Sequence, residues 1–242
     1  MLVTVVSPHL DDAVMSVGAT MAAMVRCGNE VQIATVFAGD PDRDGPPSYW
    51  DARRAVPTAG AAAMLRRDED LRATKILGVS PRWLPFDDAA YTALRDPDMI
   101  WAALEPFLLD ADLVLLPGWP LHHSDHRWVT MLVSERLAGR APTAYYSELP
   151  YAAQVIPMVK GALSGRTSDT LHHILGRKLR WVRSATERED RDAKARAVAS
   201  YSGEVANLGY RARIAALHDR LLQHESVGFP HSAHVPPGLF KP

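Results

Sequence analysis

Two short segments of the sequence bring together residue types that bind metals and move protons. Ser7-Pro8-His9-Leu10-Asp11-Asp12 ends an apolar, β-branched run that starts at Leu2, and His122-His123-Ser124-Asp125-His126 comes a few residues after the apolar run Asp112 to Leu116. A catalytic zinc ion typically takes three protein ligands from His, Asp and Glu and leaves one position for water. The two segments offer such a set in His9, Asp12 and His126.

The residues beside these three predict hydrolytic chemistry. Water bound to such an ion falls in pKa from about 15.7 towards ~7, which gives a hydroxide-like nucleophile at neutral pH. Asp11 could accept the proton of that water, and His123 could donate a hydrogen bond or a proton near the reacting carbonyl. Asp125 could orient one of the imidazoles through its second ring nitrogen.

Each segment on its own also has a simpler explanation. A pair of aspartates before a helix often serves as an N-cap and complements the helix dipole, and single histidines are common on protein surfaces. Both segments, however, follow a run that we expect to be a buried strand, and ligands of open α/β sheets bind at the carboxyl ends of the strands. Taken together they favour a metallohydrolase site.

The elements that must position these residues alternate along the first 150 residues. Short apolar runs indicate strands over 2–7, 30–37, 82–86, 112–116 and 143–147. Apolar residues at steps of three and four, with glycine after the first two segments, indicate helices over 14–25, 59–77, 99–109 and 126–137, and a long loop is expected over 38–57. This order predicts an α/β fold: a Rossmann-like, mostly parallel sheet with helices on both faces.

The remaining residues, 151–242, predict a mainly helical extension of the same single domain, which spans 1–242. Helices are expected over 193–199 and 212–222. The basic run Arg177–Arg183 is interpreted as a solvated helix face.

Composition excludes several classes of function. Lys and Arg number 27 against 28 Asp and Glu, so no basic excess favours nucleic acid as a partner. No stretch approaches the ~20 apolar residues of a membrane span, and the first residues do not look like a signal peptide. The single cysteine, Cys27, excludes an internal disulfide, so we expect a cytoplasmic protein; a homo-oligomer is possible.

The two metal-type segments resemble a known family, the PIG-L/LmbE-like N-deacetylases. Ser7 to Asp12 is similar to its (A/S)-H-x-D-D signature, and His123 to His126 is similar to its H-x-D-H signature. Three further segments extend the similarity over nearly the whole chain: Arg66-Arg67-Asp68-Glu69 before Leu77-Gly78, Leu84-Pro85-Phe86-Asp87-Asp88, and Lys194, Ala197 and Tyr201. The family commonly has proline at the positions of Leu10 and Ser124 and an acidic residue at the position of Ala13.

The resemblance implies a role for each of these residues. It implies zinc, with iron as the alternative, on His9, Asp12 and His126, with Asp11 as general base, His123 as the oxyanion-stabilising histidine and Asp125 between the two histidines. It places Arg67 (or Arg66) and Asp87 (or Asp88) near positions that contact the sugar. It implies removal of an N-acetyl or other N-acyl group from an amino sugar or a sugar-bearing natural product.

Two other functions are compatible with the same residues. An amidase that cleaves a thiol conjugate of an amino sugar would use the same site, and a catalytically silent carbohydrate-binding relative would keep the fold. A Rossmann-type oxidoreductase is excluded, because the turn after the first strand has no glycine-rich pyrophosphate cradle.

Overall fold

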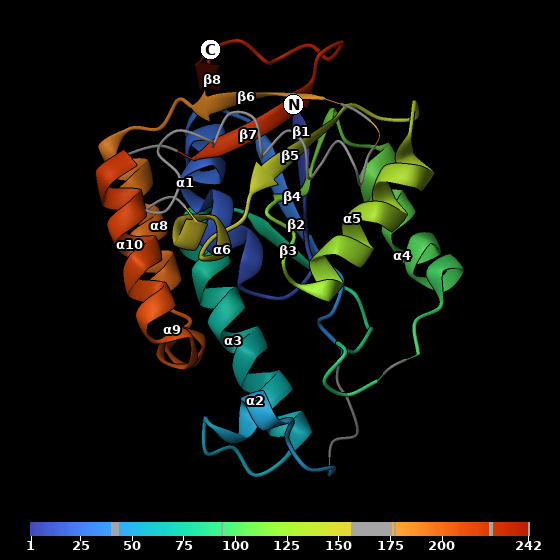
Figure 1. Ribbon diagram of the computed structural model, residues 1–242, viewed down its shortest axis with the longest axis vertical. Helices are drawn as coiled ribbons and strands as arrows, with labels where there is room; N and C mark the ends of the chain where they lie inside the picture. Colours follow the sequence, from blue (N-terminus) through green and yellow to red (C-terminus); the bar gives the residue numbers. More distant parts are fainter. Residues whose placement is uncertain (40–43, 93, 156–175, 177, 223–224, 242) are drawn as a thin grey trace.

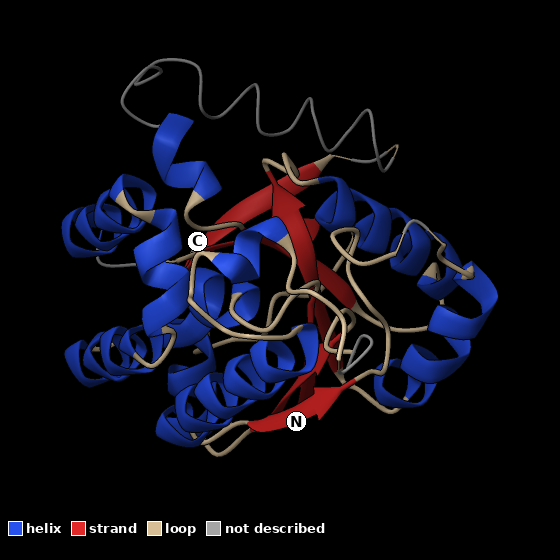
Figure 2. Cartoon of the chain, turned by 90° about the horizontal axis from the view of Figure 1, so that it is seen from below, coloured by secondary structure: helices blue, strands red, loops and turns tan. Residues whose placement is uncertain are grey.

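The computed structural model, which describes residues 1–39, 44–92, 94–155, 176, 178–222 and 225–241, contains one mixed sheet between two layers of helices (Figures 1 and 2). The strands are β1 (Leu2–Ser7), β2 (Glu30–Thr35), β3 (Ser80–Trp83), β4 (Leu113–Trp119), β5 (Thr143–Ser147), β6 (Leu179–Ser184), β7 (Ser226–Pro230) and β8 (Phe240–Lys241). They lie in the order β3-β2-β1-β4-β5-β7-β6-β8. The first five are parallel, and β7, β6 and β8 join antiparallel. The predicted Rossmann-like class is confirmed.

The helices cover both faces of this sheet. They are α1 (Asp12–Arg26), α2 (Tyr49–Ala52), α3 (Ala59–Leu77), α4 (Pro97–Leu109), α5 (Ser124–Leu137), α6 (Tyr151–Val155), α8 (Arg188–Ala199), α9 (Ser202–Leu208) and α10 (Tyr210–Leu222). Helices lie on both sides of the sheet in Figure 2. Side chains of α1, α3 and α8 form one buried core against the sheet, and side chains of α4 and α5 form the other.

The central strands are apolar in both alternating positions because both of their faces are covered. In β1, Val3 and Val5 point into the core with α1, whereas Val6 points into the core with α4 and α5. The neighbouring strand β4 divides in the same way, with Leu115 on the first side and Leu116 on the second. A continuous apolar run therefore identifies these two strands as the centre of the sheet.

Helix α3 shows why the predicted boundaries hold. The Thr58 side chain accepts a hydrogen bond from the backbone of Ala61 at the start of the helix. Gly78 ends it with φ 72°, a left-handed conformation that glycine adopts without steric cost.

Over its described residues, the C-terminal part contains the expected helices and, in addition, the strands β6, β7 and β8. The basic run from 177 to 183 was predicted to be a helix face, which is wrong over the described residues: Leu179–Ser184 is strand β6, and Arg177 lies outside the described residues. In β6 the arginines Arg180 and Arg183 face solvent while Leu179 and Val182 are buried. Six residues with three buried positions form too short a segment for the sequence pattern to distinguish a strand from a helix.

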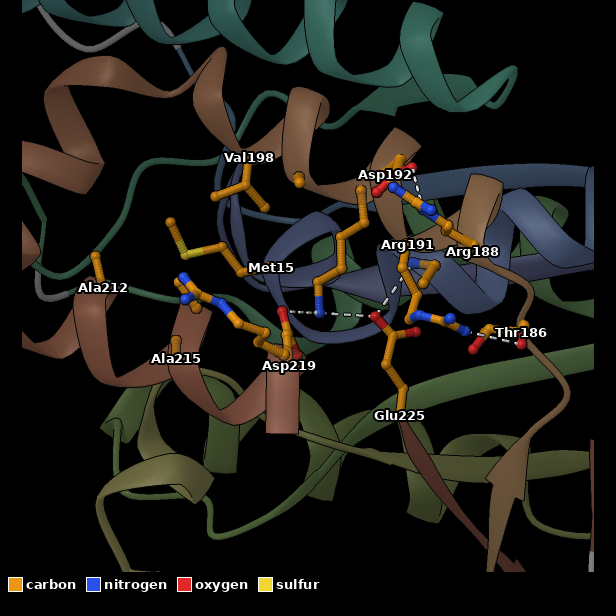
Figure 3. A pocket seen from close by; sticks show the side chains of 15 residues that line it. Met15, Thr186, Arg188, Arg191, Asp192, Val198, Ala212, Ala215, Asp219 and Glu225 are labelled. Carbon is orange, nitrogen blue, oxygen red and sulfur yellow. Dashed lines mark hydrogen bonds and ion pairs between the residues drawn. The ribbon is translucent and has the colours of Figure 1, made fainter. Parts of the chain in front are cut away.

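A buried ion cluster joins the C-terminal helices to α1. The Lys194 ammonium of α8 lies 2.8 Å from Asp219 of α10 and 2.7 Å from Glu225, which precedes β7. Figure 3 shows Asp219 and Glu225 in this cluster, at a cavity of about 520 Å³ between α1, α8 and α10. The cluster fixes the C-terminal helices on the sheet.

Among the described helices, none has the length and apolar composition that crossing a membrane requires.

Candidate metal centre and active site

The two metal-type segments meet at one edge of the sheet. Strands β1 and β4 are hydrogen-bonded parallel neighbours, so their carboxyl ends lie side by side. The turn after β1 contains His9 and leads into α1, which begins at Asp12, and the segment after β4 leads into α5, whose first turn contains His126. The chain passes from β1 to its neighbour β2 on one side, and β4 lies on the other side of β1. The strand order reverses between β1 and β4, so their carboxyl ends form a topological switch point.

Three donor atoms form a compact triangle at this edge. His9 Nδ1 lies 3.1 Å from Asp12 Oδ2, Asp12 Oδ2 lies 3.1 Å from His126 Nε2, and the two ring nitrogens are 3.3 Å apart. In a tetrahedral site with bonds of about 2.0–2.1 Å, neighbouring ligand atoms are about 3.3 Å apart. The triangle therefore fits one divalent ion with a fourth position open.

His123 is the third imidazole near this triangle. Ligand atoms of His9, His123 and His126 all lie within 4.8 Å of one another, so a set of three histidines is a geometric alternative. However, His123 Nδ1 accepts a hydrogen bond from the Asp125 backbone at the start of α5, and its side chain is 40% exposed. Asp12 is closer to both other donors, so it fits the ligand role better.

Two carboxylates hold the rings of the triangle from behind. Asp125 Oδ2 lies 3.1 Å from His9 Nε2, and its other oxygen accepts a hydrogen bond from Arg95. Glu148 Oε1 is hydrogen-bonded to His126 Nδ1, and Glu148 Oε2 accepts the Leu121 backbone N–H at 2.7 Å. A carboxylate on the second nitrogen fixes the orientation of a metal-binding imidazole and makes it more basic.

Asp125 thus lies where the sequence predicted an orienting residue, whereas Glu148 was missed. Glu148 belongs to no motif, and its position directly after β5, the neighbour of β4, was the available signal.

The ionisation of the triangle shows that it attracts positive charge. Burial alone would lower the pKa of His9, but hydrogen bonds to Asp12 and Asp125 raise it to about 9. Burial also acts against the charge of His126, yet Asp12 and Glu148 raise its pKa well above the usual value. Burial opposes ionisation of Asp12 and Asp125 too, but their histidine partners, with Arg95 for Asp125, hold the pKa of both carboxyls below the usual range. A cation bound in the triangle would take the place of the protons held there.

Asp11 does not have the simpler helix-capping role. Its side chain accepts no hydrogen bond from the first turn of α1, whereas Ser7 Oγ accepts the Ala13 N–H at 3.1 Å. Burial, followed by the charges of Asp12 and Glu204, raises the pKa of Asp11 to about 8. Burial and the charges of His9 and His126 lower the pKa of His123, so its imidazole is neutral and can donate one hydrogen bond. The site therefore offers a carboxyl that can exchange a proton beside a neutral imidazole.

A cavity of about 460 Å³ opens beside the triangle. It is lined by His9, Leu10, Asp11, Asp12, Ser48, Trp50, Arg66, Asp88, Ala89, Ala90, His123, Ser124, Asp125, Tyr151, Tyr201, Glu204, Leu208 and Arg211. This volume is large enough for a small sugar.

The predicted sugar-contacting residues separate into two groups. Arg66 and Asp88, given as the alternatives, line the cavity. Arg67 instead donates hydrogen bonds to the Ala38 carbonyl, at 2.6 Å for the shorter one, and Asp87 lines a different cavity next to Phe37. Arg66 and Arg67 point to different neighbours because adjacent residues of a helix differ by about 100° in direction.

Fold and site together define a class of protein: an α/β protein with a metal-type donor triangle at a switch point, beside a cavity of substrate size. Residues 4–137 match the family described as PIG-L, GlcNAc-PI de-N-acetylase. The chain belongs to the PIG-L family, and its class of enzyme is a hydrolytic N-deacetylase.

Three known proteins similar to this chain are described as deacetylases. A 2'-N-acetylparomamine deacetylase of Streptomyces fradiae is 33% identical over 168 residues, which are 62% of this chain and 57% of that protein. The structure of an A40926 pseudoaglycone deacetylase has a TM-score of 0.77 at 27% identity and covers 97% of this chain and 98% of its own. The zinc-inhibited form of a teicoplanin deacetylase has a TM-score of 0.74 at 24% identity, covering 94% and 97%, which shows the fold alone.

Proposed function

We propose that this protein removes an N-acetyl group from an amino sugar or a sugar-bearing natural product, with a metal ion held by His9, Asp12 and His126. The observation that supports this most directly is the donor triangle, with edges of 3.1, 3.1 and 3.3 Å, formed by residues up to 117 positions apart. Nothing in ordinary packing requires two imidazoles and a carboxylate oxygen to converge in this way beside a cavity.

Each neighbouring residue has a distinct task in this reaction. A bound divalent ion would supply a more acidic water and a polarised acetyl carbonyl. Asp11 takes a proton from the attacking water and gives it to the nitrogen of the departing amine, so one carboxyl acts first as base and then as acid. His123, being neutral, donates a hydrogen bond to the carbonyl oxygen on which negative charge develops. Asp125 and Glu148 keep the rings of His9 and His126 in place.

We propose zinc as the metal, with ferrous iron as the alternative. Two imidazoles and one carboxylate with an open fourth position are typical of catalytic zinc, and ferrous iron binds the same kind of donors. One similar structure is described as the zinc-inhibited form of a teicoplanin deacetylase. The test therefore compares the two metals and includes an excess of zinc. The free, exposed Cys27 supports placing the enzyme in the cytoplasm.

The test measures acetate release, and for the thiol conjugates release of the free amino sugar, by metal-free protein reloaded with zinc or ferrous iron. The substrates are N-acetylglucosamine glycosides, 2'-N-acetylparomamine and thiol conjugates of an amino sugar. We expect Asp11→Asn to lower kcat by about 10²–10⁴-fold with unchanged metal content, because the proton acceptor is lost. The exposed Asp110→Asn, directly after α4, is the matched control and should retain full activity. Cleavage of the thiol conjugates alone would replace the deacetylase assignment by the amidase, and no turnover with either metal would contradict both.

A further inference from the structure

The Asp125 carboxylate, which orients His9, is itself held by Arg95. One carboxylate oxygen, Oδ2, lies 3.1 Å from His9 Nε2. The other, Oδ1, accepts a hydrogen bond from Arg95 at 2.5 Å and a longer one, at 3.2 Å, from the hydroxyl of the exposed neighbour Ser124. Because both oxygens are engaged, the carboxylate cannot turn away from His9 without breaking its charge-assisted bond to Arg95.

Two aromatic rings hold the Arg95 guanidinium in turn. Its central carbon lies 4.7 Å from the centre of the Phe37 ring and 5.4 Å from the Trp128 ring, and the side chain is only 14% exposed. A guanidinium stacks on aromatic faces and is weakly hydrated, so it remains charged in such surroundings. The backbone beside Arg95 is fixed as well, because Asp96 caps the start of α4.

Arg95 lies outside the cavity in which we expect the substrate. It is not among the described residues that line the cavity beside the metal triangle, and it lines the separate cavity next to Phe37, of about 580 Å³. Its hydrogen bond to Asp125 connects it to His9. An effect of Arg95 on the site must therefore pass through its neighbours rather than through contact with the substrate.

We propose that Arg95 is a positioning residue of the metal centre, which strengthens metal binding by holding Asp125 against His9. This inference rests on the metal site of the proposed function. Asp125 orients His9 only while its own carboxylate has a fixed direction, and such partners of metal-binding histidines contribute about 10–100-fold in affinity. Arg95 also supplies the positive charge that a buried carboxylate needs. It belongs to neither metal motif and lies 30 residues before Asp125.

The test titrates the intact, metal-free protein with cobalt(II), whose visible absorption reports the geometry of its ligands. We expect Arg95→Met to raise the cobalt dissociation constant about 10-fold and to alter the spectrum, because Asp125 loses the bond that fixes its direction. Arg95→Gln also removes the charge and provides the same comparison if the methionine variant does not fold. Arg95→Lys keeps the charge and one donor and should stay within about threefold of the wild type.

A double-mutant cycle with Asp125→Asn shows whether Arg95 acts through Asp125. If it does, Arg95→Met should weaken cobalt binding by less than about twofold when Asp125→Asn is already present. Additive effects would overturn the inference, since they would place the influence of Arg95 on another path. The Phe37 ring, 5.8 Å from the His9 ring, is such a path.

Arg140→Met is the matched control and should bind cobalt as the wild type does. Arg140 also pairs with a carboxylate, Glu105 at 2.7 Å, and lies 5.6 Å from the Trp101 ring, but it follows the end of α5 that is remote from the site. Unchanged cobalt binding in Arg95→Met would overturn the inference and leave the metal triangle and the deacetylase function standing. Wild-type protein that binds cobalt no better than His126→Asn would overturn the metal site, and this inference with it.

Discussion

At the residue scale, one oxygen atom organises the site. Asp12 Oδ2 accepts the backbone N–H of His9 at 2.9 Å and lies 3.1 Å from each of the two imidazole nitrogens. The first contact sets the shape of the turn after β1, and the other two set the spacing of the donors. Because one oxygen makes all three contacts, the backbone of the turn determines the geometry of the metal triangle.

Glu148 should determine how tightly the triangle binds its metal. Glu148→Gln removes the charge that makes His126 a better donor, so we expect the metal dissociation constant to rise by about 10–100-fold. Competition with a chromophoric chelator measures this. The exposed Glu135→Gln on α5 is the control, and equal affinity for both variants would exclude the orienting role of Glu148.

A second residue, Asp70, connects the turn after β1 to α3. The Tyr201 hydroxyl lies 2.9 Å from the Leu10 carbonyl and 2.6 Å from Asp70 Oδ1, and it has only one hydrogen to donate. Both contacts are satisfied when Asp70 is protonated and donates to the Tyr201 oxygen. Burial raises the pKa of Asp70 to about 6, against hydrogen bonds from Tyr201 and Trp83 that lower it.

This raised pKa predicts a defined pH dependence of stability. The folded state binds the proton more tightly than the unfolded state, so the contribution of Asp70 is most favourable below about pH 4 and declines as the pH rises to about 6. The difference in unfolding free energy, Asp70→Asn minus wild type, should therefore increase by about 3 kcal/mol across that window. Urea unfolding of both proteins at equal metal content measures it. A flat difference, as expected for the exposed Asp68→Asn on the same helix, would show that Asp70 is not buried as an acid.

At the scale of elements, Glu225 accepts hydrogen bonds from backbone N–H groups at an irregular position of α1. The helix leaves helical geometry at Val17, and the Glu225 carboxylate accepts the backbone N–H groups of Ala19 and Thr20 just after the break. Lys194 then neutralises this carboxylate and links it to α10. A single ion cluster thus holds α1, α8 and α10 together.

Removing the lysine should destabilise the whole protein. Lys194→Met leaves Glu225 buried without its counter-ion, so we expect a loss of about 3–5 kcal/mol in unfolding free energy. Denaturant unfolding monitored by circular dichroism gives the value. Lys178→Met, at an exposed position, is the control, and a change within about 0.5 kcal/mol for both would mean that the cluster contributes no net stability.

At the scale of the whole molecule, the proposed metal ion would join distant parts of the chain. The triangle links the turn after β1 to the start of α5, two segments that the unfolded chain does not hold together. A ligand that binds only the folded state stabilises it in proportion to the logarithm of its concentration.

Metal should therefore raise the melting temperature. At a free metal concentration of about 1,000 times the dissociation constant the gain is about 4 kcal/mol, or about 8–16 °C for a domain of this size. Differential scanning calorimetry with and without chelator tests this. His126→Asn should lose the response, whereas the exposed His234→Asn should keep it; an equal response of both variants would place the metal elsewhere.

The sequence by itself determined the central sheet, the two metal-type segments and the family. Buried parallel strands are continuous apolar runs, and the ends of adjacent strands must meet, so patterns along the chain were enough to bring His9, Asp12 and His126 together. Only the tertiary structure decided which of Arg66 and Arg67 faces the cavity, that Leu179–Ser184 is a strand, and that Glu148 and Glu204 join the site. The reason is physical: helix direction, edge-strand pairing and the approach of a lone carboxylate depend on neighbours far away in the chain, and no local pattern records them.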